Sequence, residues 1–404
     1  MKHSVFINCL AIRNYKSIAA CKLQLGKLMF LVGPNGAGKS NFLDGLRFIS
    51  DALRDSLDHA LRSRGGIKEV RRRSGGHPNH FSLNVNFQMD DGSSGCYGFQ
   101  IGARPQGGYE VQEEQCKITR GDEVTRADSF TVKNGTVIDS SLKVPPAASS
   151  DRLYLVNVSG YPEFRQLYDS MSRMSFYSFS PDRIRDLQTP DAGDLLARDG
   201  ANLGSVLGKL GRDNSAVKRR IEEYLGKVVP GVSGVEPLIV GPKETLEFRQ
   251  SVAGAKHPWH FFAANMSDGT LRTLGVLVAL FQASNGHPGR IPLIGVEEPE
   301  IALHPAAAGV LRDCLREASN SSQILVTSHS PDLLDEKSID PASILAVVSD
   351  NGTTRVGRLG AVGRSVLRDH LYTVGELLRL GQLEPEPEAD SGDPEISRLP
   401  EEPQ

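Results

Sequence analysis

The sequence predicts an α/β fold in which both ends of the chain form one lobe around a parallel sheet, with an antiparallel β section and a helical section inserted between them. Three observations predict this arrangement. A glycine-rich loop, GPNGAGKS at 33–40, separates an apolar run from a helical pattern. Residues 81–145 alternate apolar and polar side chains between DG, GG and NG turns. After residue 259, helix and strand patterns alternate again.

The composition is that of an ordinary globular protein, with 404 residues, 39% hydrophobic content and a net charge of -3. No apolar run reaches the roughly 18–20 residues that a membrane-spanning helix needs, and the N-terminus shows no signal sequence. The five cysteines form no C-x-x-C pair, which argues against a zinc ribbon or a disulfide framework. We therefore expect a cytoplasmic protein without membrane contact, in which any binding of nucleic acid comes from a local basic patch.

The chain begins with short apolar runs broken by Asn, Lys and Gly, which predicts two or three strands before the glycine loop. After Ser40 the period changes, because Phe42, Leu46, Ile49 and Leu53 recur at helical spacing. The glycine loop thus connects a strand to a helix. A loop in this position can cradle phosphate oxygens with its N–H groups, beside the positive N-terminus of the helix.

The glycine loop matches the phosphate-loop pattern G-x-x-x-x-G-K-[ST] at Gly33, Gly38, Lys39 and Ser40. In this pattern Lys39 holds the β and γ phosphates of a nucleoside triphosphate, and the Ser40 hydroxyl binds Mg²⁺. A glycine turn without a ligand is the alternative. The strand-to-helix context favours the phosphate loop.

The middle of the chain contains two sections. The alternating pattern over 81–145 predicts an antiparallel meander of hairpins. Residues from 160 to 228 have helical patterns, of which KRRIEEYLGKV is the clearest. Neither section shows sustained heptads, so we expect no long coiled-coil arm.

These patterns predict a division of the chain. We expect residues 1–80 and 255–382 to form the main lobe, and residues 81–254 to form the inserted β meander and helical lobe. Residues 383–404 are acidic, rich in proline and almost free of apolar side chains, so we expect them to be a disordered tail.

The strand pattern IPLIGV at 291–296 is followed by Glu297 and Glu298. Carboxylates at the carboxyl end of a parallel strand, beside a phosphate loop, can hold a metal and deprotonate an attacking water. We assign Glu297 to Mg²⁺ and Glu298 to the water. A plain surface turn would also accommodate the sequence EEPE, and the motif alone leaves both interpretations open.

Two further motifs follow residue 260. Ser267, Asp268 and Gly269 precede a helical pattern, and the alternative to a functional role is an ordinary N-cap. In the functional interpretation Ser267 grips a γ-phosphate bound to a second subunit, because Lys39 already occupies one end of a nucleotide. His329 ends the strand pattern QILVTS; a lone histidine is usually structural, but this one could hydrogen-bond the γ-phosphate and the water.

Taken together, GPNGAGKS, MSDGTLR, VEEPEIALHP and VTSHSP resemble the Walker A, signature, Walker B with D-loop, and switch-histidine motifs of ABC-type ATPase heads. The opening AIRNYKSI and the SHSP motif resemble the RecF/SMC/OLD branch, specifically its stand-alone prokaryotic AAA family ATPases. The specific motifs cover residues 3–60 and 262–335. The resemblance implies an ABC-type P-loop ATPase head that binds ATP and Mg²⁺.

The resemblance also implies a role for each matching residue. Glu298 is the catalytic residue, His329 is the γ-phosphate switch, and Ser267 and Gly269 contact the nucleotide of a partner subunit. The phosphate-binding positions are Gly33, Asn35, Gly36, Gly38, Lys39 and Ser40.

Two positions depart from the pattern. The signature reads S-D-G-T in place of S-G-G-Q, and the metal carboxylate is Glu297 where Asp is commoner. The glutamine that usually senses Mg²⁺ has no clear counterpart, and Gln88 is a poor candidate for it.

A basic cluster lies within 61–80, where Glu69 is the one acidic residue. Such a cluster suits the phosphate backbone of DNA without reading its sequence. A solvated face or a docking surface for a partner is an equally good interpretation, because no aromatic residues are interleaved for base stacking. The cluster consists of Arg62, Arg64, Lys68, Arg71, Arg72 and Arg73.

The resemblance implies a homodimer that closes around two ATP molecules and opens after hydrolysis. The residues after His329 contain no D-x-D pair in a strand context, so we expect no TOPRIM-type nuclease. Our first hypothesis is therefore a clamp that senses nucleic acid or controls a separately encoded effector such as a nuclease, in anti-phage defence. The second is a RecF-like DNA-repair ATPase that binds DNA without an effector. A membrane importer's ATPase is third, and the S-D-G-T signature argues against it.

Overall fold

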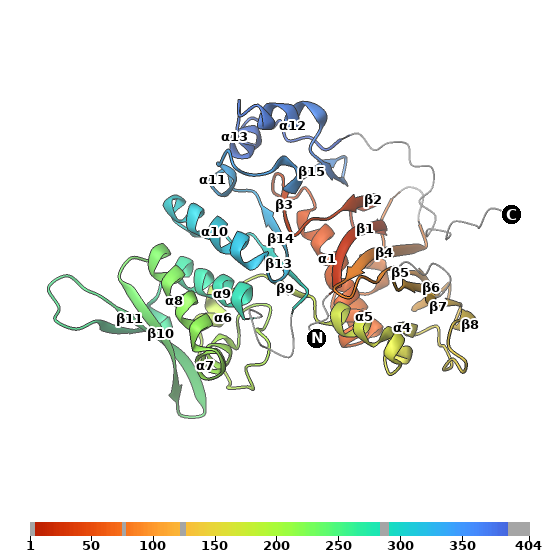
Figure 1. The fold of residues 1–404 in the computed structure, drawn as a ribbon, viewed down its shortest axis with the longest axis horizontal. Helices are drawn as coiled ribbons and strands as arrows, with labels where there is room; N and C mark the ends of the chain where they lie inside the picture. The colour runs from red at the N-terminus through yellow and green to blue at the C-terminus, as the bar shows by residue number, and fades with distance from the viewer. Residues whose placement is uncertain (1–4, 75–77, 122–126, 283–290, 387–404) are drawn as a thin grey trace.

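The structure is a computed structural model that describes residues 5–74, 78–121, 127–282 and 291–386. Among these residues, thirteen strands form one sheet in the order β8-β7-β6-β5-β4-β1-β2-β16-β15-β3-β14-β13-β9. A second sheet, β10-β11-β12, lies at the other end of the molecule (Figure 1). The large sheet joins a parallel part to an antiparallel part, so the α/β fold expected from the sequence is confirmed.

The parallel part of the sheet positions the residues of interest. It is formed by β3 (Leu28–Val32), β14 (Gln323–Ser328), β13 (Leu293–Glu297) and β9 (Ser175–Tyr177), and β15 (Ile344–Asp350) also pairs with β3 in parallel. These strands are short, apolar and almost wholly buried, as expected for strands that are covered on both faces. Because they are parallel, their carboxyl ends meet at one edge of the sheet.

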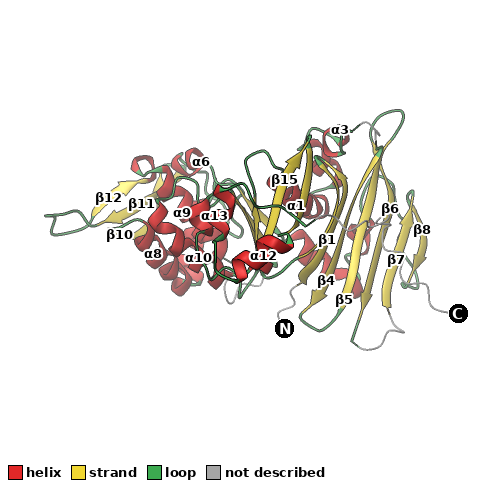
Figure 2. Cartoon of the chain, turned by 90° about the horizontal axis from the view of Figure 1, so that it is seen from above, coloured by secondary structure: helices red, strands yellow, loops and turns green. Residues whose placement is uncertain are grey.

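The antiparallel part contains the predicted meander, which continues the main sheet (Figure 2). Strand β4 pairs with β1, for example at Val85 and Leu10, and so connects the meander to the first strand of the chain. The pairing of strands that are far apart in the chain leaves no local pattern in the sequence. The sequence analysis therefore does not predict that the meander and the main sheet are continuous. The strands are β1 (Val5–Tyr15), β2 (Ile18–Gln24), β4 (His80–Met89), β5 (Ser94–Ala103), β6 (Tyr109–Thr119), β7 (Ala127–Lys133), β8 (Thr136–Ser140) and β16 (Thr353–Arg358).

The parallel strands separate two hydrophobic cores. Alternate side chains point to opposite faces of a strand, so Met29 and Leu31 pack with α1 (Lys39–Arg54) and α5 (Pro162–Ser172). Phe30 and Val32 pack on the other face with α8 (Ser215–Val228), α9 (Asp268–Phe281) and α10 (Ala308–Ala318). The helix after the glycine loop is thereby held against one face of the sheet, and α9 against the other.

The remaining elements complete the two sides of the molecule. The helical section predicted from residue 160 is present, but the sequence patterns miss β9 and the sheet formed by β10 (Val232–Val240), β11 (Lys243–Gln250) and β12 (Trp259–Phe262). The other helices are α2 (Leu57–Arg62), α3 (Ile67–Val70), α4 (Tyr154–Val158), α6 (Pro181–Arg185), α7 (Leu203–Asp213), α11 (Pro331–Leu334), α12 (Ala361–Arg368) and α13 (Val374–Arg379), and single 3₁₀ turns occupy Ala263–Asn265, Pro305–Ala307 and Pro341–Ser343.

The first residues of the predicted tail, 383–386, pack against the rest of the chain. Residues 387–404 lie outside the described residues, but Leu383 is buried and Pro385 forms a β-bridge with Leu359. Glu386 N–H donates to the carbonyl oxygen of Arg358 at 2.7 Å. The start of the predicted tail at residue 383 is therefore wrong, because Leu383 and the backbone after it pack against the end of β16.

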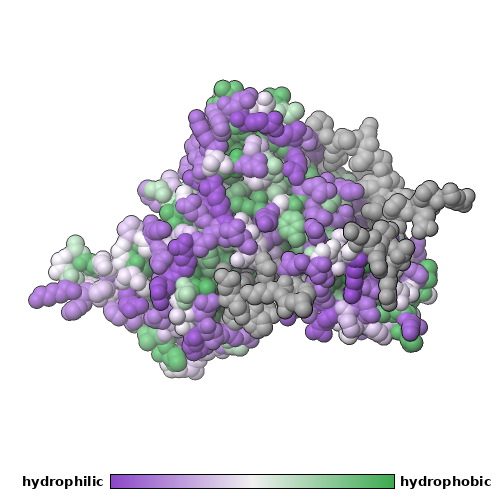
Figure 3. Space-filling model, viewed as in Figure 1, coloured by the Kyte–Doolittle hydropathy of each residue, from purple (hydrophilic) through white to green (hydrophobic). Residues whose placement is uncertain are grey.

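The surface is polar over most of the face shown in Figure 3, and small apolar patches occur at its top, over α12 and α13. Exposed apolar residues in that region are Val362, Leu371, Tyr372 and Leu380. None of the helices within the described ranges combines the length and the apolar character that crossing a bilayer requires.

Candidate functional site

The glycine loop lies at the carboxyl end of β3. Gly36 and Gly38 have φ values of 78° and 102°, in the left-handed region that glycine adopts readily. Gly38 is the N-cap of α1, so the free N–H groups of the first helical turn border the loop. A Cβ at Gly38 would lie 2.0 Å from Thr354 Oγ1, so the loop leaves room only for glycine there. The result is a turn that can accommodate an anion, with β16 packed against its outer side and with Asn35 and Gly36 exposed at its tip.

Lys39 is almost buried, with 5% of its surface exposed. Its ammonium donates hydrogen bonds to the carbonyl oxygens of Gly33, at 2.9 Å, and Pro34, at 3.1 Å. Burial lowers the pKa of Lys39, whereas the charges of Glu298 and Glu300 act in the opposite direction. The ammonium therefore lies close enough to both carboxylates to sense their charge.

The two side chains expected to bind Mg²⁺ contact each other. Ser40 Oγ donates to Glu297 Oε2 at 2.9 Å, and Arg198 Nη2 donates to Glu297 Oε1 at 2.8 Å. Hydroxyl and carboxylate oxygens are the hard ligands that Mg²⁺ prefers, and this ion usually completes its shell with water and substrate phosphates. The described residues contain no group of three or more His, Cys, Asp and Glu that could hold a metal alone. The donor set thus fits Mg²⁺ bound together with phosphates.

Glu298 directly follows β13 and adopts a φ of 44°, which is uncommon for a residue other than glycine. Its N–H donates to the carbonyl oxygen of Thr327, on β14, at 3.0 Å. Its carboxylate Oε1 lies 3.1 Å from Nδ1 of His329, which follows β14. A backbone of this kind costs about 1–3 kcal/mol and persists where the surroundings impose it. The strained turn brings Glu298 and His329 together from neighbouring strands.

Glu300 is a residue of this site that the sequence analysis misses. Its Oε1 accepts hydrogen bonds from Ser328 Oγ at 2.6 Å and from His329 N at 3.3 Å. Burial raises the pKa of Glu300, although the bond from Ser328 acts to lower it. Its Oε2 is buried and accepts no hydrogen bond from the described residues. Glu300 thus holds the backbone of His329 in place. The sequence feature that could have predicted this role is the third acidic residue of the EEPE motif.

Side-chain hydroxyl groups from β16 and from the turn between β1 and β2 hydrogen-bond to the glycine loop and to each other. Thr354 Oγ1 donates to the carbonyl oxygen of Ala37 at 2.9 Å and lies 2.6 Å from Ser17 Oγ. Asn41 Nδ2 donates to the same Ser17 Oγ at 2.6 Å. The loop is therefore held by the turn between β1 and β2 and by β16, and no local pattern marks Thr354 for this role.

A buried network of ion pairs holds α1 against the turn between β1 and β2. Arg64 Nη2 lies 2.9 Å from a carboxylate oxygen of Asp44 and 2.9 Å from one of Asp51. Tyr15 Oη donates to Asp44 at 2.8 Å, and Lys16 pairs with it at 2.6 Å. Burial acts to raise the pKa of Asp44, but Arg64 and Lys16 outweigh it and hold the pKa well below its usual range. The motif RNYKS therefore anchors the helix that carries Lys39 and Ser40.

The predicted basic cluster is largely paired. The prediction that Arg64 belongs to a free basic surface is wrong, because its side chain is only 4% exposed and neutralised by acids of α1. Lys68 is exposed. The other contacts are Arg62 with Asp58, Arg73 with Glu69, Arg72 with Thr353 Oγ1, and Arg71 with Pro78 O and Asn79 Oδ1.

Ser267 and Gly269 lie at the start of α9, whereas the glycine loop precedes α1. Ser267 is exposed and caps α9, where its Oγ accepts from Thr270 N at 3.2 Å. Helix α9 packs against α6, α7, α8 and α10, in the helical part of the molecule (Figure 1). A Cβ at Gly269 would lie 2.2 Å from Ala302 O, so the signature turn packs on the segment after Glu298. Within the described residues no hydrogen bond joins Ser267 to the glycine loop.

Gln88 does not lie at this site. It is exposed on β4, where it pairs with Phe6 near the start of β1. The glycine loop lies beside the C-terminal end of β1, whereas Gln88 pairs with a residue near the N-terminal end of β1. The two therefore lie at opposite ends of the strands. The suggestion that Gln88 senses Mg²⁺ is wrong, because the register of β4 directs it away.

The comparisons with known proteins agree with the fold described above. A family model described as AAA domain, putative AbiEii toxin, Type IV TA system, matches residues 28–335. The Smc head bound to the C-winged helix domain of ScpA is 15% identical, with a TM-score of 0.56 over 89% of this chain and 99% of that one. The Smc head with an extended coiled coil bound to the C-terminal domain of ScpA, derived from Pyrococcus furiosus, is 13% identical, with a TM-score of 0.55 over 91% and 99%. Among curated proteins, none matches the chain.

The likeness to the Smc heads shows a shared fold. The span matched by the family model includes the glycine loop, the signature turn, both strand-end glutamates and His329. The chain is an ATPase with the ABC-type fold of SMC heads, and it belongs to the AAA domain family described as putative AbiEii toxins of type IV toxin–antitoxin systems.

Proposed function

We propose that this ATPase is a clamp: two chains hold two ATP molecules between them and separate after hydrolysis, and this cycle controls a separately encoded effector. The observation that carries the proposal is that the groups expected to bind ATP form two sets on different elements, with no hydrogen bond between the two sets among the described residues. Lys39, Ser40 and Glu298 gather at one edge of the sheet, whereas Ser267 is exposed at the start of α9. In a two-fold dimer, the sheet edge of one chain can face the signature surface of the other chain. Each such pair of surfaces then completes one ATP site.

Each residue at the sheet edge then has a defined task. The glycine loop and Lys39 hold the β and γ phosphates, while Ser40 and Glu297 hold Mg²⁺, which neutralises charge on those phosphates. Glu298 accepts a proton from the attacking water. His329, placed 3.1 Å from Glu298, orients that carboxylate and donates to the γ-phosphate.

Two findings support control of a partner protein. The family is described as a type IV toxin–antitoxin system, which pairs two components. The Smc heads that share the fold are bound to domains of ScpA, another protein. For this chain we propose an effector such as a nuclease, in anti-phage defence.

The solution mass of the Glu298→Gln protein, with and without ATP and Mg²⁺, tests the clamp. Blocked hydrolysis should trap the closed dimer, so the mass should double when ATP is added. Ser267→Arg in the same background places a long cation at the signature surface, and it should abolish the doubling while ATP still binds the glycine loop. A mass that ATP leaves unchanged would contradict the clamp.

A RecF-like DNA-repair ATPase is the second candidate, favoured by the exposed Lys68 and the exposed ion pairs of Arg62 and Arg73. Hydrolysis stimulated by duplex DNA in the chain alone, with a strong decrease as salt rises, would support this alternative. Hydrolysis that DNA leaves unchanged would favour the effector.

A further inference from the structure

Arg198 links the carboxylate at the end of β13 to the helical part of the molecule. Its guanidinium Nη2 lies 2.8 Å from Glu297 Oε1, while Ser40 Oγ occupies the other carboxylate oxygen at 2.9 Å. Both oxygens of Glu297 are thus engaged, one from α1 and one from the loop before α7. A second cation at Glu297 would repel the guanidinium of Arg198, since like charges at this separation interact unfavourably.

The backbone around Arg198 is fastened on both sides. Ser178 N–H, directly after β9, donates to the carbonyl oxygen of Arg198 at 3.0 Å. Leu196 N–H donates to Gln282 Oε1 at 3.0 Å. Gln282 is the C-cap residue of α9, and its Nε2 donates to Tyr177 Oη at 2.7 Å. A shift of the Arg198 loop is therefore passed to the C-terminal end of α9.

Helix α9 connects this end to the signature turn. It runs without interruption from Asp268 to Phe281, about 21 Å at 1.5 Å per residue, and most of its side chains are buried. A packed helix of this length moves as one body, and Ser267 caps its other end. Continuous contacts therefore join Glu297 to Ser267 through Arg198 and α9.

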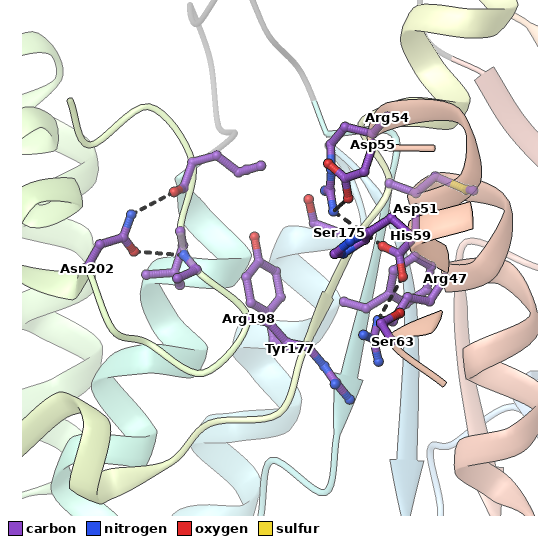
Figure 4. A pocket seen from close by; sticks show the side chains of 15 residues that line it. Arg47, Asp51, Arg54, Asp55, His59, Ser63, Ser175, Tyr177, Arg198 and Asn202 are labelled. Carbon is purple, nitrogen blue, oxygen red and sulfur yellow. Dashed lines mark hydrogen bonds and ion pairs between the residues drawn. The ribbon is translucent and has the colours of Figure 1, made fainter. Parts of the chain in front are cut away.

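A cavity of about 380 Å³ beside Arg198 has room for its side chain to move (Figure 4). Its lining also includes Asp51 and Asp55, which both pair with Arg54. Arg47 also lines the cavity, and its pKa is lowered first by burial and next by the charge of Arg198. The ion pair with Glu297 offsets this repulsion between Arg198 and Arg47.

We propose that Arg198 is a positioning residue through which occupation of the metal site moves the signature helix. The inference rests on the proposed function, in which Ser40 and Glu297 hold Mg²⁺ and Ser267 serves the partner subunit. A cation at Glu297 displaces Arg198 from that carboxylate, the loop at 196–198 shifts, and α9 adjusts the position of Ser267. Arg198 thus takes the sensing task for which the sequence shows no glutamine.

Manganese binding tests this inference without hydrolysis, because free Mn²⁺ gives an EPR signal that disappears on binding. The unmodified protein and Arg198→Gln are titrated with Mn²⁺ in the presence of a non-hydrolysable ATP analogue. Arg198→Gln should bind Mn²⁺ about fivefold more tightly, the size expected for loss of one partly exposed competing ion pair. Arg54→Gln is the matched control, because Arg54 lines the same cavity but pairs with Asp51 and Asp55. Its Mn²⁺ affinity should be unchanged.

Hydrogen exchange supplies the readout for movement. In the unmodified protein, Mn²⁺ with the analogue should change the protection of the amides of Ser178 and Leu196, and Arg198→Gln should lose this change although the metal is bound. Unchanged Mn²⁺ affinity in Arg198→Gln, or an exchange response equal to that of the unmodified protein, would overturn this inference. Either result would leave the proposed function standing. Failure of the unmodified protein to bind the analogue would contradict the proposed function, and this inference with it.

Discussion

Glu114 gives a stability prediction whose size follows from the structure. Its side chain is fully buried in the β section, where Oε1 accepts hydrogen bonds from Tyr97 Oη at 3.1 Å and Leu155 N at 2.9 Å, and Oε2 accepts from Tyr154 N. Burial raises the pKa of Glu114 from 4.5 to about 7, although these hydrogen bonds act to lower it. The folded protein therefore binds this proton more tightly than the unfolded chain does.

The sign of the pH dependence follows from proton linkage. Between pH 4.5 and about pH 7 the folded state holds more protons on Glu114 than the unfolded state, so stability falls as the pH rises. The contribution is full at acidic pH and is lost once the pH passes the folded pKa. With these two pKa values, the free energy of unfolding decreases by about 2.5 kcal/mol between about pH 5 and pH 8.

The variant Glu114→Gln keeps the shape of the side chain and removes its titration. Urea unfolding followed by circular dichroism at several pH values gives the free energy of unfolding of both proteins. The unmodified protein should lose about 2.5 kcal/mol relative to the variant as the pH rises from about 5 to 8, whatever the constant offset between them. Parallel pH profiles would refute the reasoning, because the buried carboxyl would then titrate alike in both states.

Three further substitutions test the supports of the site. Arg64→Met removes the most buried of the cations that pair with Asp44 and Asp51 and should lower the free energy of unfolding by about 3–5 kcal/mol, whereas Arg62→Met, at an exposed pair, should cost under about 1 kcal/mol; equal losses would contradict this. Thr354→Val removes the hydroxyl behind the glycine loop and should weaken ATP binding about 5–10-fold in calorimetry, as one lost hydrogen bond allows, while Thr353→Val should have no effect. Gly269→Ala should abolish ATP-dependent dimerisation but not ATP binding, and a dimer of normal affinity would show that the turn has room for Cβ.

The parts of the site predictable from the sequence are those where a local motif ends a strand. The glycine loop and the pair Glu297 and Glu298 each follow an apolar run, and His329 follows another, so the rule that parallel strands end at one edge brings them together. Contacts between distant segments carry no such pattern. Arg198 could not be predicted, because it lies in an irregular loop far from the motif that it contacts.

Arg64 shows a different limit. A run of basic residues with few acids nearby in sequence suggests a surface, but the neutralising acids, Asp44 and Asp51, come from an earlier helix. Their spacing of seven residues puts both on one side of α1, between apolar positions. That spacing was a usable signal for a buried cation, and it would have separated Arg64 from the rest of the cluster.

The central claim is that each ATP site is built from two chains, and mixing two inactive variants tests it most directly. Lys39→Ala lacks the ammonium that we propose binds phosphate, and Ser267→Arg should block the signature surface. A mixed dimer has one intact site, made by Lys39 of one chain and Ser267 of the other. The account predicts that an equal mixture regains between about a quarter of the normal hydrolysis rate, if the chains pair at random, and about half of it, if only mixed dimers form, since each mixed dimer has one of two sites intact. A mixture no more active than the two variants measured separately would contradict it.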